Sequence, residues 1–199
     1  LRVVDILEKD GAGLNLSFEV RDGIVNHGMS GRPATLEGRA VRIADKIAYT
    51  NHDMDDAIRA GILSEDDVPD DIKVVLGKTH AERLDFLIKN IIYCSIDKDD
   101  IIMDDKVMDA FLKLRDFMTD NLYFNPVCKS EEVKADAMLS MLYDHYISHP
   151  DDLPDEYIRL MQARGEDPGR IVCDYISGMT DVYSVQIYEK LFVPKFWEK

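Results

Sequence analysis

A short stretch of the chain combines residue types that can do chemistry together. It contains two carboxylates, an ammonium and a phenol, which we call the polar stripe: Asp45, Lys46, Tyr49 and Asp53. At about 100° and 1.5 Å per residue, Tyr49 lies roughly 40° from Asp45 around a helix axis. Asp53 lies roughly 80° round and about 12 Å along that axis. This length suits a helix that contacts a nucleoside triphosphate from its phosphates to its sugar.

The residue types alone leave a second interpretation of the polar stripe open. Charged side chains on a surface helix are usually solvated, and a tyrosine among them is usually half-buried packing. Apolar neighbours indicate instead that this helix is packed: Ile43, Ala44, Ile47 and Ala48. A carboxylate in a packed helix needs a metal ion, an ion pair or several hydrogen-bond donors.

The histidines do not form a recognisable metal site. His52 and Asp53 are adjacent, but a functional His-Asp metal pair also needs another histidine upstream and a separate aspartate downstream. His27 is the only upstream histidine, and we expect it near the end of another helix. We therefore interpret His52 as a polar helix residue. The other three histidines are expected to be structural: His80, His145 and His149.

Composition narrows the class of protein. The chain has 199 residues, 46% of them hydrophobic, which is enough for one compact domain or a large part of one. Its net charge of −15 and isoelectric point near 4.6 argue against a nucleic-acid surface but not against a phosphorylated small molecule. No apolar run approaches the roughly 20 residues that span a bilayer. Widely spaced cysteines predict reduced, buried thiols in a cytoplasmic protein: Cys94, Cys128 and Cys173.

Helical periodicity runs through almost the whole sequence, so the predicted class is all-α. Because the sequence opens without methionine and in the middle of an apolar helical pattern, we expect a portion of the protein to precede Leu1. Ser64 and the acidic residues after it, 65–71, are interpreted as the start of a short acidic helix or turn, or as a solvated loop. Six methionines are interpreted as core residues: Met103, Met108, Met118, Met138, Met141 and Met161. Helices are predicted at residues 15–27 and 35–60, and another begins at a capping box formed by Thr79 and Glu82. A helix of about twenty residues is predicted to end near Tyr123, and the next covers residues 130–150. Short helices are predicted after Pro154 and after Pro168, and a last one runs from Thr180 to Pro194.

Four blocks of the sequence, in order, resemble the bacterial deoxyguanosine-triphosphate triphosphohydrolase-like proteins, which are HD-domain dNTP triphosphohydrolases. These blocks are residues 13–24, residues 43–57, residues 114–118 with Tyr123, and residues 173–181. The resemblance implies the helical C-terminal portion of an HD-domain phosphohydrolase. It further implies that residues 1–62 are the C-terminal part of the catalytic domain, and that residues 63–199 are a helical region completing the nucleotide pocket.

The resemblance also assigns roles to individual residues. In this family water attacks the α-phosphorus of a deoxynucleoside triphosphate beside a metal held by His, His-Asp and a distant Asp, which releases deoxynucleoside and triphosphate. Asp45 matches that distant Asp. By the same match, Lys46 and Arg115 would contact the phosphates, Tyr49 would line the phosphate and sugar pocket, and Asp53 would accept a hydrogen bond from the sugar 3′-hydroxyl. Tyr123 would pack on the deoxyribose and leave no room for a 2′-hydroxyl.

The resemblance has limits that shape the expectation. The other metal ligands and the catalytic histidine of the family belong upstream of Leu1, so Asp45 is the only catalytic-site ligand expected here, and the 199-residue chain alone should be inactive. Val182 stands where the family pattern has an arginine. The intact enzyme should need a divalent metal such as Mg²⁺ or Mn²⁺, bind a deoxynucleoside triphosphate and form a homo-oligomer. The alternatives are an HD-type phosphohydrolase acting on another nucleotide, or a non-catalytic regulatory or assembly module.

Overall fold

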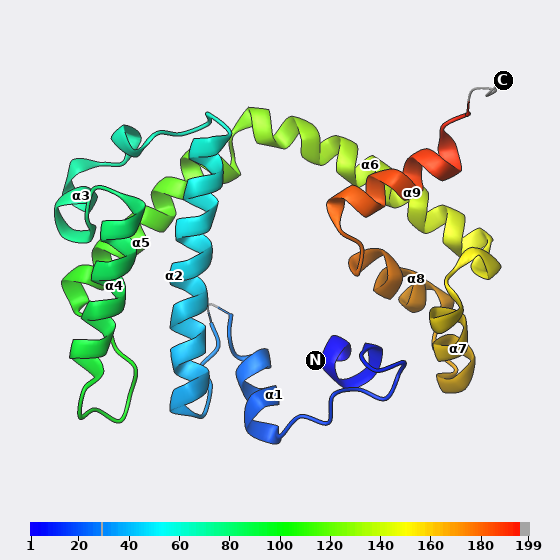
Figure 1. Cartoon of the computed structure of the whole chain (residues 1–199), viewed down its shortest axis with the longest axis horizontal. Helices are drawn as coiled ribbons and strands as arrows, with labels where there is room; N and C mark the ends of the chain where they lie inside the picture. Colours follow the sequence, from blue (N-terminus) through cyan, green and yellow to red (C-terminus); the bar gives the residue numbers. More distant parts are fainter. Residues whose placement is uncertain (29, 196–199) are drawn as a thin grey trace. The chain divides into compact units, whose positions relative to one another are not determined.

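The chain is built from helices and their connections (Figure 1). This computed structural model describes residues 1–28 and 30–195. No strand occurs among the described residues, so the predicted all-α class is confirmed. None of the described helices is long and apolar enough to cross a membrane.

The chain divides into two compact units. The first unit contains Leu1 and residues 16–128, and the second contains residues 2–15 and 129–199. The boundary predicted between residues 62 and 63 marks the end of the catalytic domain in an intact enzyme. The two compact units do not test this boundary, so it stays a prediction.

The first unit carries the polar stripe. Its elements are α1 (Phe18–Val25), α2 (Leu36–Arg59), the 3₁₀ turn η2 (Glu65–Asp67), α3 (Asp70–Leu76), α4 (His80–Ser95), α5 (Asp105–Met118) and the π-helical turn η3 (Thr119–Tyr123). Its core is contributed mainly by α2, α3, α4 and α5, and includes Ile47, Met54, Ile72, Leu76, Leu87, Phe111, Leu114 and Met118. The polar stripe and the helices facing it therefore share one packed unit.

The second unit combines the start of the chain with its last third. Its elements are the π-helical turn η1 (Val3–Leu7), α6 (Pro126–Ser148, whose first residues through Cys128 belong to the first unit), the 3₁₀ turn η4 (Pro150–Asp152), α7 (Asp155–Arg164), α8 (Pro168–Ser177) and α9 (Asp181–Phe192). Arg2 closes this unit through a bidentate ion pair with the buried Asp174, at 2.8 and 2.6 Å. Ile6 and Leu7 pack against its core.

Most predicted helix starts are confirmed, because capping is encoded locally. The hydroxyls of Thr35, Thr79 and Thr180 each accept a backbone hydrogen bond in the first turn of the helix that follows. The box at Thr79 is only half formed, since the Glu82 carboxylate accepts from the backbone N–H of Lys78 at 2.8 Å. The Thr79 hydroxyl still satisfies one unpaired donor of the first turn, the backbone N–H of Glu82.

Three expectations are wrong in detail, and a fourth is only partly met. Helix α6 begins at Pro126 rather than Ser130, because proline suits the first turn and the Asn125 side chain accepts from the backbone of Val127. After Ser64 the expected short acidic turn is present as η2, but Asp70 and Asp71 open α3 instead of lying in a solvated loop. Met141 is 40% exposed, so it is not a core residue. Cys173 is exposed and the other two cysteines are half-buried, so the predicted burial of the thiols fails, although all three are free.

Candidate functional site

Helix α2 holds the polar stripe beside the core of the first unit. Ile47 and Met54 bury one face of this helix, at 3% and 1% exposure. The stripe residues lie on the adjoining faces with different exposure: Lys46 is buried, Tyr49 and Asp53 are half-buried, and Asp45 is exposed. The stripe is thus neither a fully solvated face nor part of the apolar core.

The Lys46 side chain is buried. Lys46 is 8% exposed, and no hydrogen bond or ion pair of its side chain is found in residues 1–28 and 30–195. Burial lowers the pKa of Lys46, the guanidinium groups of Arg42 and Arg115 lower it further, and Asp45 opposes them. A buried cation beside other cations is unfavourable unless an anion joins it.

One end of the site carries three cations from two helices and therefore suits the binding of phosphate. We call Arg42, Lys46 and Arg115 the cation cluster. Arg42 precedes Lys46 by one helical turn on α2, and its Nε donates to the Gly28 carbonyl at 3.1 Å. Arg115 reaches the same region from α5. Sequence interpretation misses Arg42, although its spacing of four residues before Lys46 is visible in the sequence.

At the other end of the site, which suits the binding of a sugar, an aspartate and a tyrosine are in direct contact. The Tyr123 hydroxyl donates to Asp53 Oδ2, which joins η3 to α2. Burial raises the pKa of Tyr123, its bond to Asp53 and the nearby Tyr49 raise it further, and Arg115 opposes them. Five of the predicted site residues therefore lie in one neighbourhood: Lys46, Tyr49, Asp53, Arg115 and Tyr123.

A π-helical turn positions Tyr123. Helix α5 ends at Met118 and continues directly as η3, which spans Thr119–Tyr123. The wider i→i+5 turn changes the direction in which Tyr123 leaves the helix axis, and such turns are frequent at functional sites. Sequence periodicity predicts one continuous helix here and does not reveal this turn.

Asp45 occupies a different environment from the rest of the stripe. It is exposed and lines a groove of about 700 Å³ between α1 and α2, together with Glu19, His27, Glu37 and apolar residues of both helices. Arg115 and Tyr123 do not line this groove. Asp45 therefore does not share a common groove with these two residues, although the resemblance assigns all three to one site.

The ligands of a metal ion are incomplete in this part of the protein. Asp45 can supply one carboxylate oxygen, a donor that hard divalent cations accept. Within residues 1–28 and 30–195, no group of three or more His, Cys, Asp or Glu side chains could hold a metal ion. The residues present therefore fit one ligand of a metal site and not the whole of it.

A buried arginine fixes the middle of α2. Arg83 of α4 is 1% exposed; its Nε donates to Asn51 Oδ1 at 2.9 Å, and its Nη2 lies 2.9 Å from Met54 Sδ. Its two Nη atoms lie 3.4 and 3.3 Å from the Glu65 carboxylate oxygens. The Asn51 amide in turn donates to the Ile47 carbonyl at 2.7 Å. This network lies within two turns of Lys46 and Asp53 along α2 and so limits how that helix can shift.

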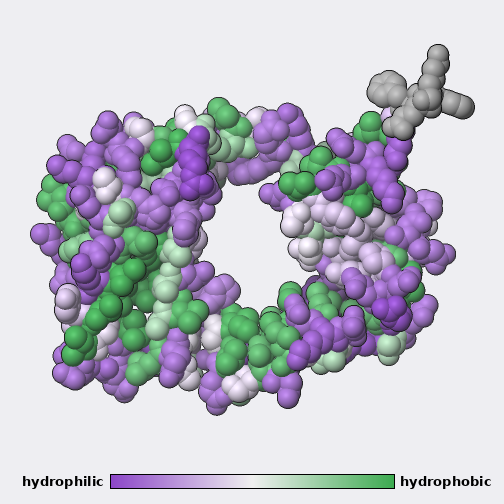
Figure 2. Space-filling view, viewed as in Figure 1, coloured by the Kyte–Doolittle hydropathy of each residue, from purple (hydrophilic) through white to green (hydrophobic). Residues whose placement is uncertain are grey.

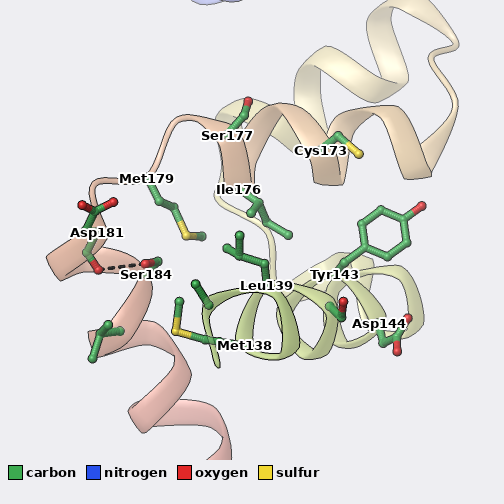
Figure 3. A pocket seen from close by; sticks show the side chains of 13 residues that line it. Met138, Leu139, Tyr143, Asp144, Cys173, Ile176, Ser177, Met179, Asp181 and Ser184 are labelled. Carbon is green, nitrogen blue, oxygen red and sulfur yellow. Dashed lines mark hydrogen bonds between the residues drawn. The ribbon is translucent and has the colours of Figure 1, made fainter. Parts of the chain in front are cut away.

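Two other hollows lack the charge that a phosphate needs. A pocket of about 890 Å³ in the second unit has an apolar floor with the carboxylates of Asp144 and Asp181 at its edges (Figure 3). A groove of about 450 Å³ between α2 and α4 is lined by alanine, leucine and isoleucine side chains, in the area where Figure 2 shows an apolar surface. No lysine or arginine lines either one.

The chain is similar in sequence to several known proteins. Residues 101–190 match the family of the phosphohydrolase-associated domain. Over 197 residues the chain is 42% identical to a deoxyguanosinetriphosphate triphosphohydrolase-like protein of Caldanaerobacter subterraneus, covering 99% of this chain and 58% of the relative. A protein of the same description from Clostridium perfringens is 42% identical, covering 98% and 59%.

A third relative extends the pattern. The protein of the same description from Clostridium tetani is 39% identical over 206 residues, covering 98% of this chain and 58% of the relative. The chain therefore spans about three fifths of the length of these relatives.

Proposed function

Because this chain is a homologue of the deoxyguanosinetriphosphate triphosphohydrolase-like proteins, we propose that the intact protein hydrolyses a deoxynucleoside triphosphate to deoxynucleoside and triphosphate. The observation that carries this proposal is the convergence, around α2, of the cation cluster and the Asp53–Tyr123 contact. One end of this arrangement suits a phosphate chain and the other suits a sugar.

At the phosphate end, Lys46 and Arg115 bind the substrate and offset the negative charge that increases in the transition state. Their positive charges are already assembled at low exposure, so little reorganisation is needed when the substrate arrives. Arg115 can contact two phosphate oxygens at once, because a guanidinium presents its donors as a planar fork.

At the sugar end, Asp53 and Tyr123 orient the deoxyribose. The Asp53 carboxylate accepts a hydrogen bond from the 3′-hydroxyl, and the Tyr123 ring covers C2′, so a ribose hydroxyl clashes or stays unpaired there. Tyr49 lies on α2 between Lys46 and Asp53 and close to Tyr123, so it is the residue that contacts both the sugar and the nearest phosphate in this proposal.

The remainder of the intact protein has a defined task in this proposal. Asp45 supplies one ligand to a divalent metal, and the other ligands come from parts of the relatives that this chain does not match. A bound divalent metal lowers the pKa of its water and polarises the phosphoryl group. We assign the intact protein to the cytoplasm and to a homo-oligomer. The apolar groove between α2 and α4 supports an additional packing partner, since such surfaces rarely stay uncovered.

Product analysis tests the proposed reaction. The full-length protein is incubated with dGTP and Mg²⁺ or Mn²⁺ in ¹⁸O-labelled water. The products are then separated and their masses are measured by mass spectrometry. The proposal requires deoxyguanosine and triphosphate, with the heavy oxygen in triphosphate. Release of dGMP with pyrophosphate, or turnover of monophosphates alone, supports a different HD-type phosphohydrolase. Absence of turnover for any nucleotide supports a regulatory or assembly module.

A further inference from the structure

Along α2, Asp53, Lys46 and Arg42 lie in the same order as the sugar and the successive phosphates of a nucleotide. Asp53 lies near the C-terminal end of α2, Lys46 lies about 10 Å before it, and Arg42 lies about 6 Å before Lys46. If the sugar binds at Asp53, successive phosphates extend toward the N-terminal end of α2. Arg42 is then the cation farthest from the sugar.

The position of Arg42 is fixed by its surroundings. It is half-buried, and its Nε donates to the Gly28 carbonyl in the loop between α1 and α2, at 3.1 Å. Side chains four residues apart on a helix are neighbours, so the guanidinium of Arg42 lies beside Lys46.

The charge pattern of the chain makes this cluster unusual. The chain carries a net charge of −15, yet Arg42 and Lys46 lie one helical turn apart on α2, and Arg115 of α5 lies near Lys46. Like charges one helical turn apart repel one another. A ligand that carries several negative charges in a row can meet Lys46 and Arg42 in turn, because the two residues lie about 6 Å apart along the helix axis.

We propose that Arg42 is a specificity-determining residue that contacts the terminal phosphate of the substrate and thereby selects triphosphates over diphosphates and monophosphates. This inference rests on the proposed function, because the sugar contact at Asp53 and Tyr123 sets the register of the phosphate chain. Neither the polar stripe nor the resemblance assigns a role to Arg42.

The test compares nucleotides that differ only in the third phosphate. The full-length protein is titrated with dGTP and with dGDP by calorimetry, with divalent metal chelated so that no turnover occurs. Three variants are measured beside the wild type: Arg42→Gln, Arg42→Lys and Arg59→Gln. Arg59→Gln is the matched control, since it removes the same charge from the exposed C-terminal end of the same helix.

We expect Arg42→Gln to weaken dGTP binding about 10- to 100-fold and to change dGDP binding less than about 3-fold. Arg42→Lys should fall between the wild type and Arg42→Gln, because it keeps the charge and loses the fork of donors. Arg59→Gln should leave both affinities unchanged. Thermal unfolding of each variant establishes that it is folded before binding is compared.

Three results would overturn the inference. Equal losses for dGTP and dGDP in Arg42→Gln would show that Arg42 does not read the third phosphate. Unchanged dGTP binding in both Arg42 variants, or wild-type protein that binds dGDP as tightly as dGTP, would also contradict it. Hydrolysis of dGTP to deoxyguanosine and triphosphate is measured separately, so the proposed function can stand while this inference falls.

Discussion

Asp53 and Tyr123 are separated by 70 residues in sequence and meet in one hydrogen bond. The spacing of the polar stripe places Asp53 on the correct helix from sequence alone. Tyr123 enters only through the resemblance, because nothing in its local pattern points toward α2. Their contact is the closest link that the structure provides between two predicted site residues.

Substitution of Tyr123 tests discrimination between sugars. Tyr123→Ala in the full-length protein should reduce the preference for dGTP over GTP by roughly 10- to 100-fold, because the ring no longer excludes a 2′-hydroxyl. Steady-state turnover of the two nucleotides gives this ratio. Tyr123→Phe is the control, since it removes the bond to Asp53 and keeps the ring. A preference unchanged in Tyr123→Ala would place the ring away from the sugar.

Among the elements, those with strong local signals are the ones that sequence predicts. Threonine caps and proline starts depend on a few neighbouring residues, so the starts of α2, α4, α8 and α9 follow from sequence. The short α3 and the π-helical turn η3 do not, because packing in the first unit stabilises them more than local preference does. The Arg83 network that connects α4 to α2 is likewise invisible in sequence.

Removal of the buried arginine should destabilise the first unit. Arg83→Met leaves the buried Asn51 amide oxygen without its donor and should lower the free energy of unfolding by roughly 2–4 kcal/mol. Urea unfolding followed by circular dichroism measures the change. Arg59→Met, an exposed position on α2, should cost less than about 0.5 kcal/mol. Equal stability of the two variants would show that the Arg83 network contributes little.

The acidic turn before α3 should make stability depend on pH. Hydrogen bonds from the backbone and side chain of Ser64 lower the pKa of Asp67 in the folded chain. Asp67 therefore stabilises the fold above the pKa of an unfolded aspartate, and this contribution is lost as pH falls through its lowered pKa. The stability difference between wild type and Asp67→Asn should shrink as pH is lowered from 7 toward about 3. A difference that is constant or larger in acid would exclude this role.

At the scale of the whole molecule, the start of the chain belongs to the unit that its end forms. Arg2 and Asp174 are 172 residues apart in sequence, so no local pattern could predict their ion pair or the division into two units. The all-α class, by contrast, follows from periodicity that persists through the whole sequence. Long-range pairing of charges is therefore, like α3 and η3, a part of this fold that sequence reasoning does not reach.

Loss of the Arg2 contact should affect one unit only. Arg2→Met leaves the buried Asp174 carboxylate with the more distant Arg170, at 3.7 Å, and should lower the stability of the second unit by roughly 1–3 kcal/mol. Amide hydrogen exchange followed by mass spectrometry should show weaker protection in residues 129–199 and unchanged protection in residues 16–128. The control is Arg32→Met, which removes an exposed arginine of the first unit. Weaker protection throughout the chain would contradict independent units.

The central claim is that the polar stripe of α2 belongs to a site that releases triphosphate, with Asp45 as its metal ligand. The most direct measurement is triphosphate release from dGTP by full-length Asp45→Ala, beside wild type and Asp56→Ala. Asp56 is an exposed aspartate on the same helix that pairs with Arg59 at 3.3 Å. We expect no metal-dependent release from Asp45→Ala and wild-type release from Asp56→Ala. Wild-type turnover by Asp45→Ala would contradict the assignment.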